Sequence, residues 1–178
     1  MSFLTNALSE YARSTPPGLE GRGPDPAGEI HFDLDDTAIA LKAIDAGLVE
    51  ARATGSRAAV CVATLAPPDG SGVSATDIDA ADAWLGRRLR ERDRLYRVGP
   101  TFVIVASGIA HPSDAEELAA RIAGLPTAPG DLLAVGLAIH PAHGDDATTL
   151  FDRARQSARR AQLERRAQEL AFAGVGSQ

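Results

Sequence analysis

Residues 90–105 decide the fold, and they read Arg-Glu-Arg-Asp-Arg-Leu-Tyr-Arg-Val-Gly-Pro-Thr-Phe-Val-Ile-Val. They open with an Arg-x-x-Asp pair, Arg90 and Asp93, at the end of a charged segment that we expect to be helical. Residues 95–98 and 101–106 are strand-like and are separated by a Gly-Pro turn. Two short strands around such a turn predict a β-hairpin. The stretch therefore predicts a helix that leads directly into a hairpin.

Outward from the hairpin, apolar patterning and turn residues predict alternating helices and strands. The strands are expected at residues 58–65 and 131–139. The first helix is expected at about residues 33–53, with Gly55 closing it. The second is expected to run to about Arg92, with Thr76 as its N-cap and Asp79 as the acidic partner of the cap. The third is expected from Ser113 to about Ile122, and the last from Asp145 or Asp146 to about Phe172. This order predicts an α/β sandwich of the ferredoxin-like type, in which a mixed central sheet contains the hairpin and is flanked by helices.

The ends of the chain are predicted to lie outside this domain. Residues 1–33 read as an N-terminal arm, with a short helix over residues 3–13 and a linker rich in proline and glycine over residues 14–30. Residues 34–163 form the predicted domain. Residues 164–178 extend the last helix and end in a tail that we expect to be frayed.

Composition narrows the class of protein. The net charge of -6 argues against general nucleic-acid binding, and no apolar run approaches the ~20 residues of a membrane span. Cys61 is the single cysteine, so a disulfide framework is excluded, and its apolar neighbours predict a buried, inert thiol. These features fit the reducing cytoplasm. Lys42 is the only lysine among 18 basic residues, and six arginines fall within residues 87–97.

The hairpin resembles the central hairpin of the GGDEF (diguanylate cyclase) family. Two other segments carry the same resemblance. Residues 135–162 are similar to the family's late strand and final helix, and residues 115–122, Ala-Glu-Glu-Leu-Ala-Ala-Arg-Ile, look like its "AxxLAERIR" helix. The resemblance extends from about Asp35 to Gln162 and implies the cyclase-palm fold.

The resemblance also implies that the catalytic residues of the family are missing. The cyclase reaction requires divalent metal, and hard cations require carboxylate ligands. The family has such a ligand at the end of the first strand, where this chain has Thr64-Leu-Ala-Pro. Pro100 and Thr101 replace the acids of the hairpin turn, and Gln162 replaces the lysine of the last helix. We therefore expect no enzyme activity, no catalytic residue, no metal site and no cofactor.

In contrast, the motif of the family's inhibitory site is intact. By resemblance, Arg90, Asp93 and Arg121 occupy the positions that bind cyclic di-GMP. Arginine donates to O6 and N7 of guanine, and aspartate accepts from its N1–H and N2–H. The alternative interpretation of Arg90 and Asp93 is a surface ion pair of small energy. Auxiliary phosphate contacts could come from three further arginines, for which we favour solvent exposure: Arg87, Arg94 and Arg97.

The expected function is a non-catalytic receptor domain that binds cyclic di-GMP and relays its level to a bacterial protein partner. No membrane contact and no direct nucleic-acid contact are expected. The alternative is a ligand-free dimerisation or scaffold module, and a homodimer bridged by the ligand is compatible with the first hypothesis. A metal site at His140 and His143 is disfavoured, because these residues are expected in a loop.

Overall fold

Strand β1 (Arg57–Leu65) lies inside a four-stranded sheet of order β2-β3-β1-β4. It pairs with β3 (Thr101–Ile109) on one side and with β4 (Leu133–Ile139) on the other, and β2 (Arg94–Val98) forms the hairpin with β3. The structure is a computed structural model, and it describes residues 34–65, 72–123 and 133–175. Three predictions concern residues outside the described ranges. They are the helix at residues 3–13, the linker at residues 14–30 and the first two residues of the strand predicted at 131–139.

All strand pairings among the described residues are antiparallel, so the expectation of a mixed sheet is wrong. Strands joined by a crossover helix do run parallel, but they are not neighbours. Strand β3 lies between β1 and β2, and β1 lies between β3 and β4. The α/β sandwich of ferredoxin-like type is otherwise as predicted, with the element order α-β-α-β-β-α-β-α.

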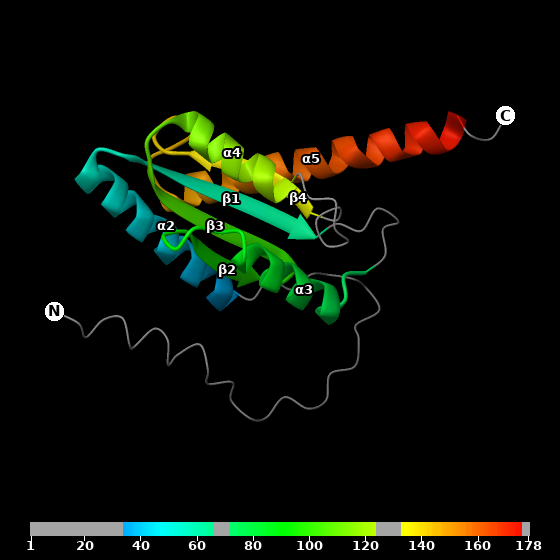
Figure 1. Cartoon of the computed structure of the whole chain (residues 1–178), viewed down its shortest axis with the longest axis horizontal. Coiled ribbons are helices and arrows are strands. Elements are labelled where there is room, and N and C mark those ends of the chain that lie inside the picture. The colour runs from blue at the N-terminus through cyan, green and yellow to red at the C-terminus, as the bar shows by residue number, and fades with distance from the viewer. Residues whose placement is uncertain (1–33, 66–71, 124–132, 176–178) are drawn as a thin grey trace, which may run out of the picture.

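Helices cover both faces of the sheet (Figure 1). Helices α2 (Leu34–Thr54) and α5 (Ala147–Val175) pack on the face that presents Val60 and Val62. Helices α3 (Ala75–Gly86) and α4 (Pro112–Ala123) pack on the face of Ala59 and Cys61. A strand buried on both faces requires a continuous apolar sequence, and β1 has one. Cys61 is buried as expected, and burial raises the pKa of its thiol to about 12.

Helix α5 is the longest of the described elements, and its C-terminal half extends beyond the ends of the strands (Figure 1). Asp146 precedes it and accepts hydrogen bonds from the backbone N–H and the hydroxyl of Thr149, at 2.8 and 2.6 Å. Leu150, Ala154 and Ala158 are buried against the sheet, as their spacing predicts. Among the described residues, no helix has the length and apolar character needed to cross a membrane.

Ser74, and not Thr76, begins α3. Its hydroxyl accepts the backbone N–H of Asp77 at 3.2 Å, and the Asp77 carboxylate accepts the backbone N–H of Ser74 at 3.1 Å. This is a complete capping box. The Ser74 hydroxyl also donates to the Asp77 carboxylate at 2.6 Å, and this hydrogen bond, together with the one from the Ser74 N–H, lowers the pKa of Asp77. The expected N-cap at Ser113 is also wrong, because α4 begins at Pro112, a residue well suited to the first position of a helix.

Replacement of Ser74 by alanine is expected to lower the free energy of unfolding by about 1 kcal/mol, because the N-cap acceptor is lost. Thr76→Ala is the control. Thr76 is exposed inside the first turn, so its change should stay within about 0.5 kcal/mol. Urea denaturation of the two variants measures both values. A larger effect at Thr76 than at Ser74 would contradict this helix start.

Candidate functional site

The Arg90–Asp93 segment is a turn and not the end of a helix. Helix α3 ends at Gly86, so the expectation of a helix to Arg92 is wrong. The Asp93 carboxylate Oδ2 accepts the backbone N–H of Arg90 at 2.9 Å, and the Asp93 N–H donates to the Arg90 carbonyl at 3.0 Å. An aspartate that bonds the backbone in this way favours a turn over a helix. Among the described residues, no ion pair joins the side chains of Arg90 and Asp93.

The turn leaves both side chains with free hydrogen-bonding capacity. Arg90 is exposed, and within the described part of the chain its guanidinium forms no ion pair. Asp93 uses only Oδ2, so Oδ1 remains available as an acceptor. Leu89 and Leu95, on either side of the turn, pack against the core cluster beneath α3 and α4. The turn is therefore attached to the same face of the sheet as these two helices.

Arg121 lies in the last turn of α4, on that same face. Its Nε and Nη2 atoms are buried and have no hydrogen-bond partner in the described structure. A buried donor without an acceptor costs about 1–3 kcal/mol, and more for a charged group. No hydrogen bond or ion pair between described residues joins Arg121 to Arg90 or Asp93. Within the described part of the chain, two nitrogens of this guanidinium are therefore available to an acceptor.

The other arginines of the cluster have different environments. Arg97 forms an exposed ion pair with Asp79 at 3.2 Å, and Arg87 and Arg94 are exposed. Sequence reasoning missed Arg88, whose guanidinium lies 4.6 Å from the centroid of the Trp84 ring. The four-residue spacing between Trp84 and Arg88 was the available signal. Trp84 is buried in the core, and its Nε1 is also without a partner among the described residues.

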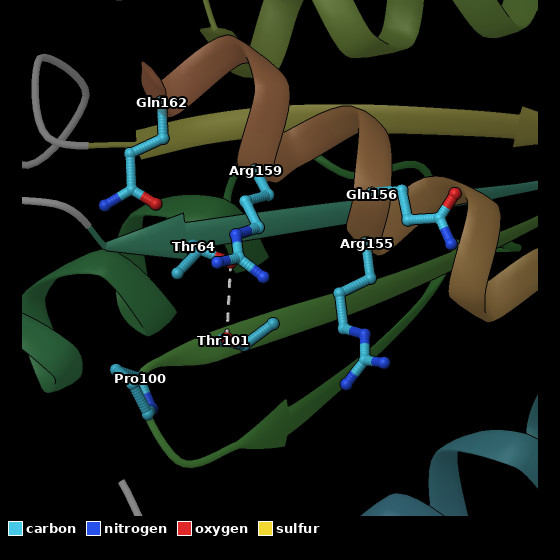
Figure 2. Close-up of a pocket in the computed structure, with 7 residues that line it drawn as sticks. All are labelled: Thr64, Pro100, Thr101, Arg155, Gln156, Arg159 and Gln162. Carbon is cyan, nitrogen blue, oxygen red and sulfur yellow. Dashed lines mark hydrogen bonds between the residues drawn. The ribbon is translucent and has the colours of Figure 1, made fainter. Parts of the chain in front are cut away.

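A second feature is a pocket of about 520 Å³ between the end of β1, the β2–β3 turn and α5 (Figure 2). The hydroxyls of Thr64 and Thr101 form a hydrogen bond of 3.3 Å across its floor. Among the described residues, the side chains that line the pocket include no carboxylate: Thr64, Pro100, Thr101, Arg155, Gln156, Arg159 and Gln162. Three of these, Pro100, Thr101 and Gln162, stand where the resemblance placed two turn acids and the lysine of an active cyclase. Sequence reasoning did not identify Arg155 and Arg159 as part of a pocket.

The two histidines expected in a loop stabilise it. His143 Nδ1 accepts the backbone N–H of Ile139 at 2.9 Å, and His140 Nδ1 lies 3.1 Å from the Gly144 carbonyl and 3.4 Å from an Asp145 oxygen. Within the described ranges, no group of three or more histidine, cysteine, aspartate or glutamate residues is placed to hold a metal ion.

Comparison with known proteins identifies the fold. No family model and no curated protein sequence matches the chain. Among solved structures, the GGDEF domain of YfiN (TpbB) from Pseudomonas aeruginosa matches with a TM-score of 0.62 and 20% identity, over 71% of this chain and 89% of that one. A sensory box/GGDEF family protein from Caulobacter crescentus matches with a TM-score of 0.56 and 22% identity, over 70% and 90%. The GGDEF domain of DgcB from Caulobacter crescentus, solved in complex with c-di-GMP, matches with a TM-score of 0.54 and 16% identity, over 69% and 82%. The chain therefore has the fold of GGDEF domains.

Proposed function

We propose that this chain is a non-catalytic receptor domain that binds cyclic di-GMP at Arg90, Asp93 and Arg121 and relays the level of this second messenger to a bacterial protein partner. The observation that carries the proposal is that Nε and Nη2 of Arg121 are buried and have no hydrogen-bond partner among the described residues, on the face of the sheet to which the Arg90–Asp93 turn is attached. A solved neighbour of the same fold is a complex with c-di-GMP, which supports this ligand.

The hydrogen-bonding groups of the turn match a guanine base. The exposed Arg90 guanidinium offers paired N–H donors for O6 and N7 of guanine. The free Oδ1 of Asp93 can accept from the guanine N1–H or N2–H. Arg121 adds two donors that have no partner in the described structure, and an anionic phosphate or a base acceptor would satisfy them. Asp93 Oδ2 accepts the backbone N–H of Arg90, and this hydrogen bond holds the carboxylate close to Arg90. It leaves the guanidinium groups of Arg90 and Arg121 available to the ligand.

The composition of the pocket supports a non-catalytic role. Phosphoryl transfer of the cyclase type requires metal ions to neutralise the triphosphate and activate a hydroxyl. A hard cation requires oxygen ligands, mostly carboxylates, and the described side chains that line this pocket include no carboxylate. Arg155 and Arg159 would in addition repel a cation.

Calorimetric titration of the full chain with cyclic di-GMP tests the proposal. Binding is expected with a dissociation constant below about 100 µM, and Arg90→Ala is expected to weaken it at least about tenfold, or ~1.4 kcal/mol. Arg92→Ala removes a neighbouring exposed arginine of the same turn and is the matched control, with a change below about threefold.

Absence of heat at ~100 µM ligand, or equal losses for Arg90→Ala and Arg92→Ala, would refute the receptor proposal. A self-associating protein whose melting temperature does not respond to nucleotide would favour the rival function, a ligand-free dimerisation module. The feature that suggests this rival is the extension of α5 past the sheet, where Leu163 is 59% exposed.

A further inference from the structure

We infer that Arg88, which lies over the ring of Trp84, forms a stacking subsite for the second base of the ligand, and that this subsite accepts adenine as well as guanine. The inference rests on the proposed cyclic di-GMP site and deepens it. Arg90 and Asp93 offer hydrogen-bonding groups for one guanine, whereas a cyclic dinucleotide carries two bases. The second base therefore needs a separate surface close to the turn.

Trp84 and the end of α3 hold the Arg88 side chain in place. The backbone N–H groups of Arg88 and Leu89 both donate to the Leu85 carbonyl, at 2.9 and 3.2 Å, so the chain continues the helical turn past the last residue of α3. This turn brings the Arg88 guanidinium over the Trp84 ring, 4.6 Å from its centroid. Trp84 is 6% exposed and belongs to the core cluster beneath α3 and α4, so the indole is a fixed support.

The other side of the Arg88 guanidinium is available to a ligand. Arg88 is exposed, and within the described residues its guanidinium forms no ion pair. The indole can cover only one side of this planar group, and the opposite side remains open. A planar guanidinium stacks on aromatic rings, including those of bases. Because Trp84 already restricts the side chain, stacking costs less conformational entropy here than on an arginine without such a support.

This subsite lies next to the Arg90–Asp93 turn. Arg88 precedes Arg90 by two residues, so their Cα atoms are at most about 7 Å apart. Leu89 and Leu95 pack against the same core cluster as Trp84, which attaches the chain on both sides of the turn to one face of the sheet. The two bases of a cyclic dinucleotide are joined by a closed ring of two riboses and two phosphates. When one base binds the turn, the second therefore stays close to Arg88.

The two parts of the site differ in what they recognise. Hydrogen bonds from Arg90 and Asp93 depend on the edge of the base and select guanine. Stacking on Arg88 uses the flat face that every base has, so it does not distinguish adenine from guanine. The site therefore selects cyclic dinucleotides that contain at least one guanine and tolerates a second purine of either kind.

The test is calorimetric titration of the full chain with cyclic di-GMP, cyclic GMP–AMP and cyclic di-AMP. The wild type is expected to bind the first two with affinities within about fivefold of each other, and cyclic di-AMP at least about tenfold more weakly. Arg88→Lys keeps the charge and removes the planar face, so it should weaken cyclic di-GMP at least about fivefold. Arg92→Lys makes the same change at an exposed arginine of the turn and should alter the affinity by less than about twofold.

Three results would overturn the stacking subsite. They are wild-type affinity for cyclic di-GMP in Arg88→Lys, equal losses in Arg88→Lys and Arg92→Lys, and binding of cyclic GMP–AMP as weak as that of cyclic di-AMP. Each of them can occur while the wild type binds cyclic di-GMP, so the receptor proposal would survive. A wild type that binds none of the three cyclic dinucleotides would instead refute the receptor proposal, and the subsite with it.

Discussion

Gly136→Ala is expected to lower the free energy of unfolding by about 3 kcal/mol or more, because β4 and α5 touch at this glycine. A Cβ atom at position 136 would lie 2.1 Å from the carbonyl oxygen of Ala154 and 2.2 Å from the amide nitrogen of Ala158. Both are backbone atoms of a helix, so no change of rotamer can relieve the contact. Helix α5 would have to move away from the sheet, and the buried surfaces of Leu150, Ala154 and Ala158 would lose packing.

Gly86→Ala provides the matched control. Gly86 is the last residue of α3, and a Cβ there would meet nothing within 4 Å. Alanine also has a higher helix propensity than glycine, so this variant should be neutral or more stable by up to about 1 kcal/mol. Urea denaturation of both variants at neutral pH measures the difference. A Gly136→Ala protein that unfolds within about 1 kcal/mol of the wild type would show that β4 and α5 are not in this close contact.

The central strand and the hairpin could be predicted because their signals are local. The apolar run of β1 is required by burial on both faces, and the Gly-Pro turn separates two strand-like segments. Gly55 has a positive φ of 64° directly after α2, as a closing glycine should. The antiparallel order could not be read from such local signals, because it depends on which strand inserts between two others.

The start of α3 shows why local signals can be ambiguous. Ser74 and Thr76 are both good N-caps, and each is followed three residues later by an aspartate, Asp77 or Asp79. The overlapping patterns predict two helix starts, and the structure uses only the first. The end of α3 was missed because Arg87–Arg92 are mostly good helix formers. In the structure α3 ends at Gly86, and the side chain of Asp93 then accepts the backbone N–H of Arg90 in a turn.

The candidate sites depend on contacts between distant parts of the chain. Arg121 was selected by resemblance, and nothing in its own segment indicates that two of its guanidinium nitrogens are buried without a partner among the described residues. Arg155 and Arg159 were not selected as site residues from the sequence. Their spacing from Gln162 indicates a common stripe, but only the fold shows that this stripe faces Thr64 and Thr101.

Arg121→Met is expected to act in opposite directions on stability and on ligand binding. Methionine fills a similar space and removes two buried donors that have no partner in the described structure. Replacement of an uncompensated buried charge by an apolar side chain is often stabilising, and here we expect a gain of about 1 kcal/mol in the free energy of unfolding. The affinity for cyclic di-GMP is expected to fall about 100-fold, or ~2.7 kcal/mol, because a charge-assisted contact is lost.

Arg153→Met is the control for this pair of measurements. Arg153 is an exposed arginine of α5 without a hydrogen bond or ion pair in the described structure, so both stability and affinity should stay near the wild-type values. Urea denaturation without ligand and calorimetry with cyclic di-GMP give the two quantities for each variant. If Arg121→Met lowers stability and leaves affinity unchanged, then Arg121 serves the fold and not the ligand. A gain in stability together with a loss of affinity would instead show that Arg121 lowers the stability of the fold but is needed to bind the ligand. Such a loss of stability in favour of function is expected of residues in binding sites and not of structural residues.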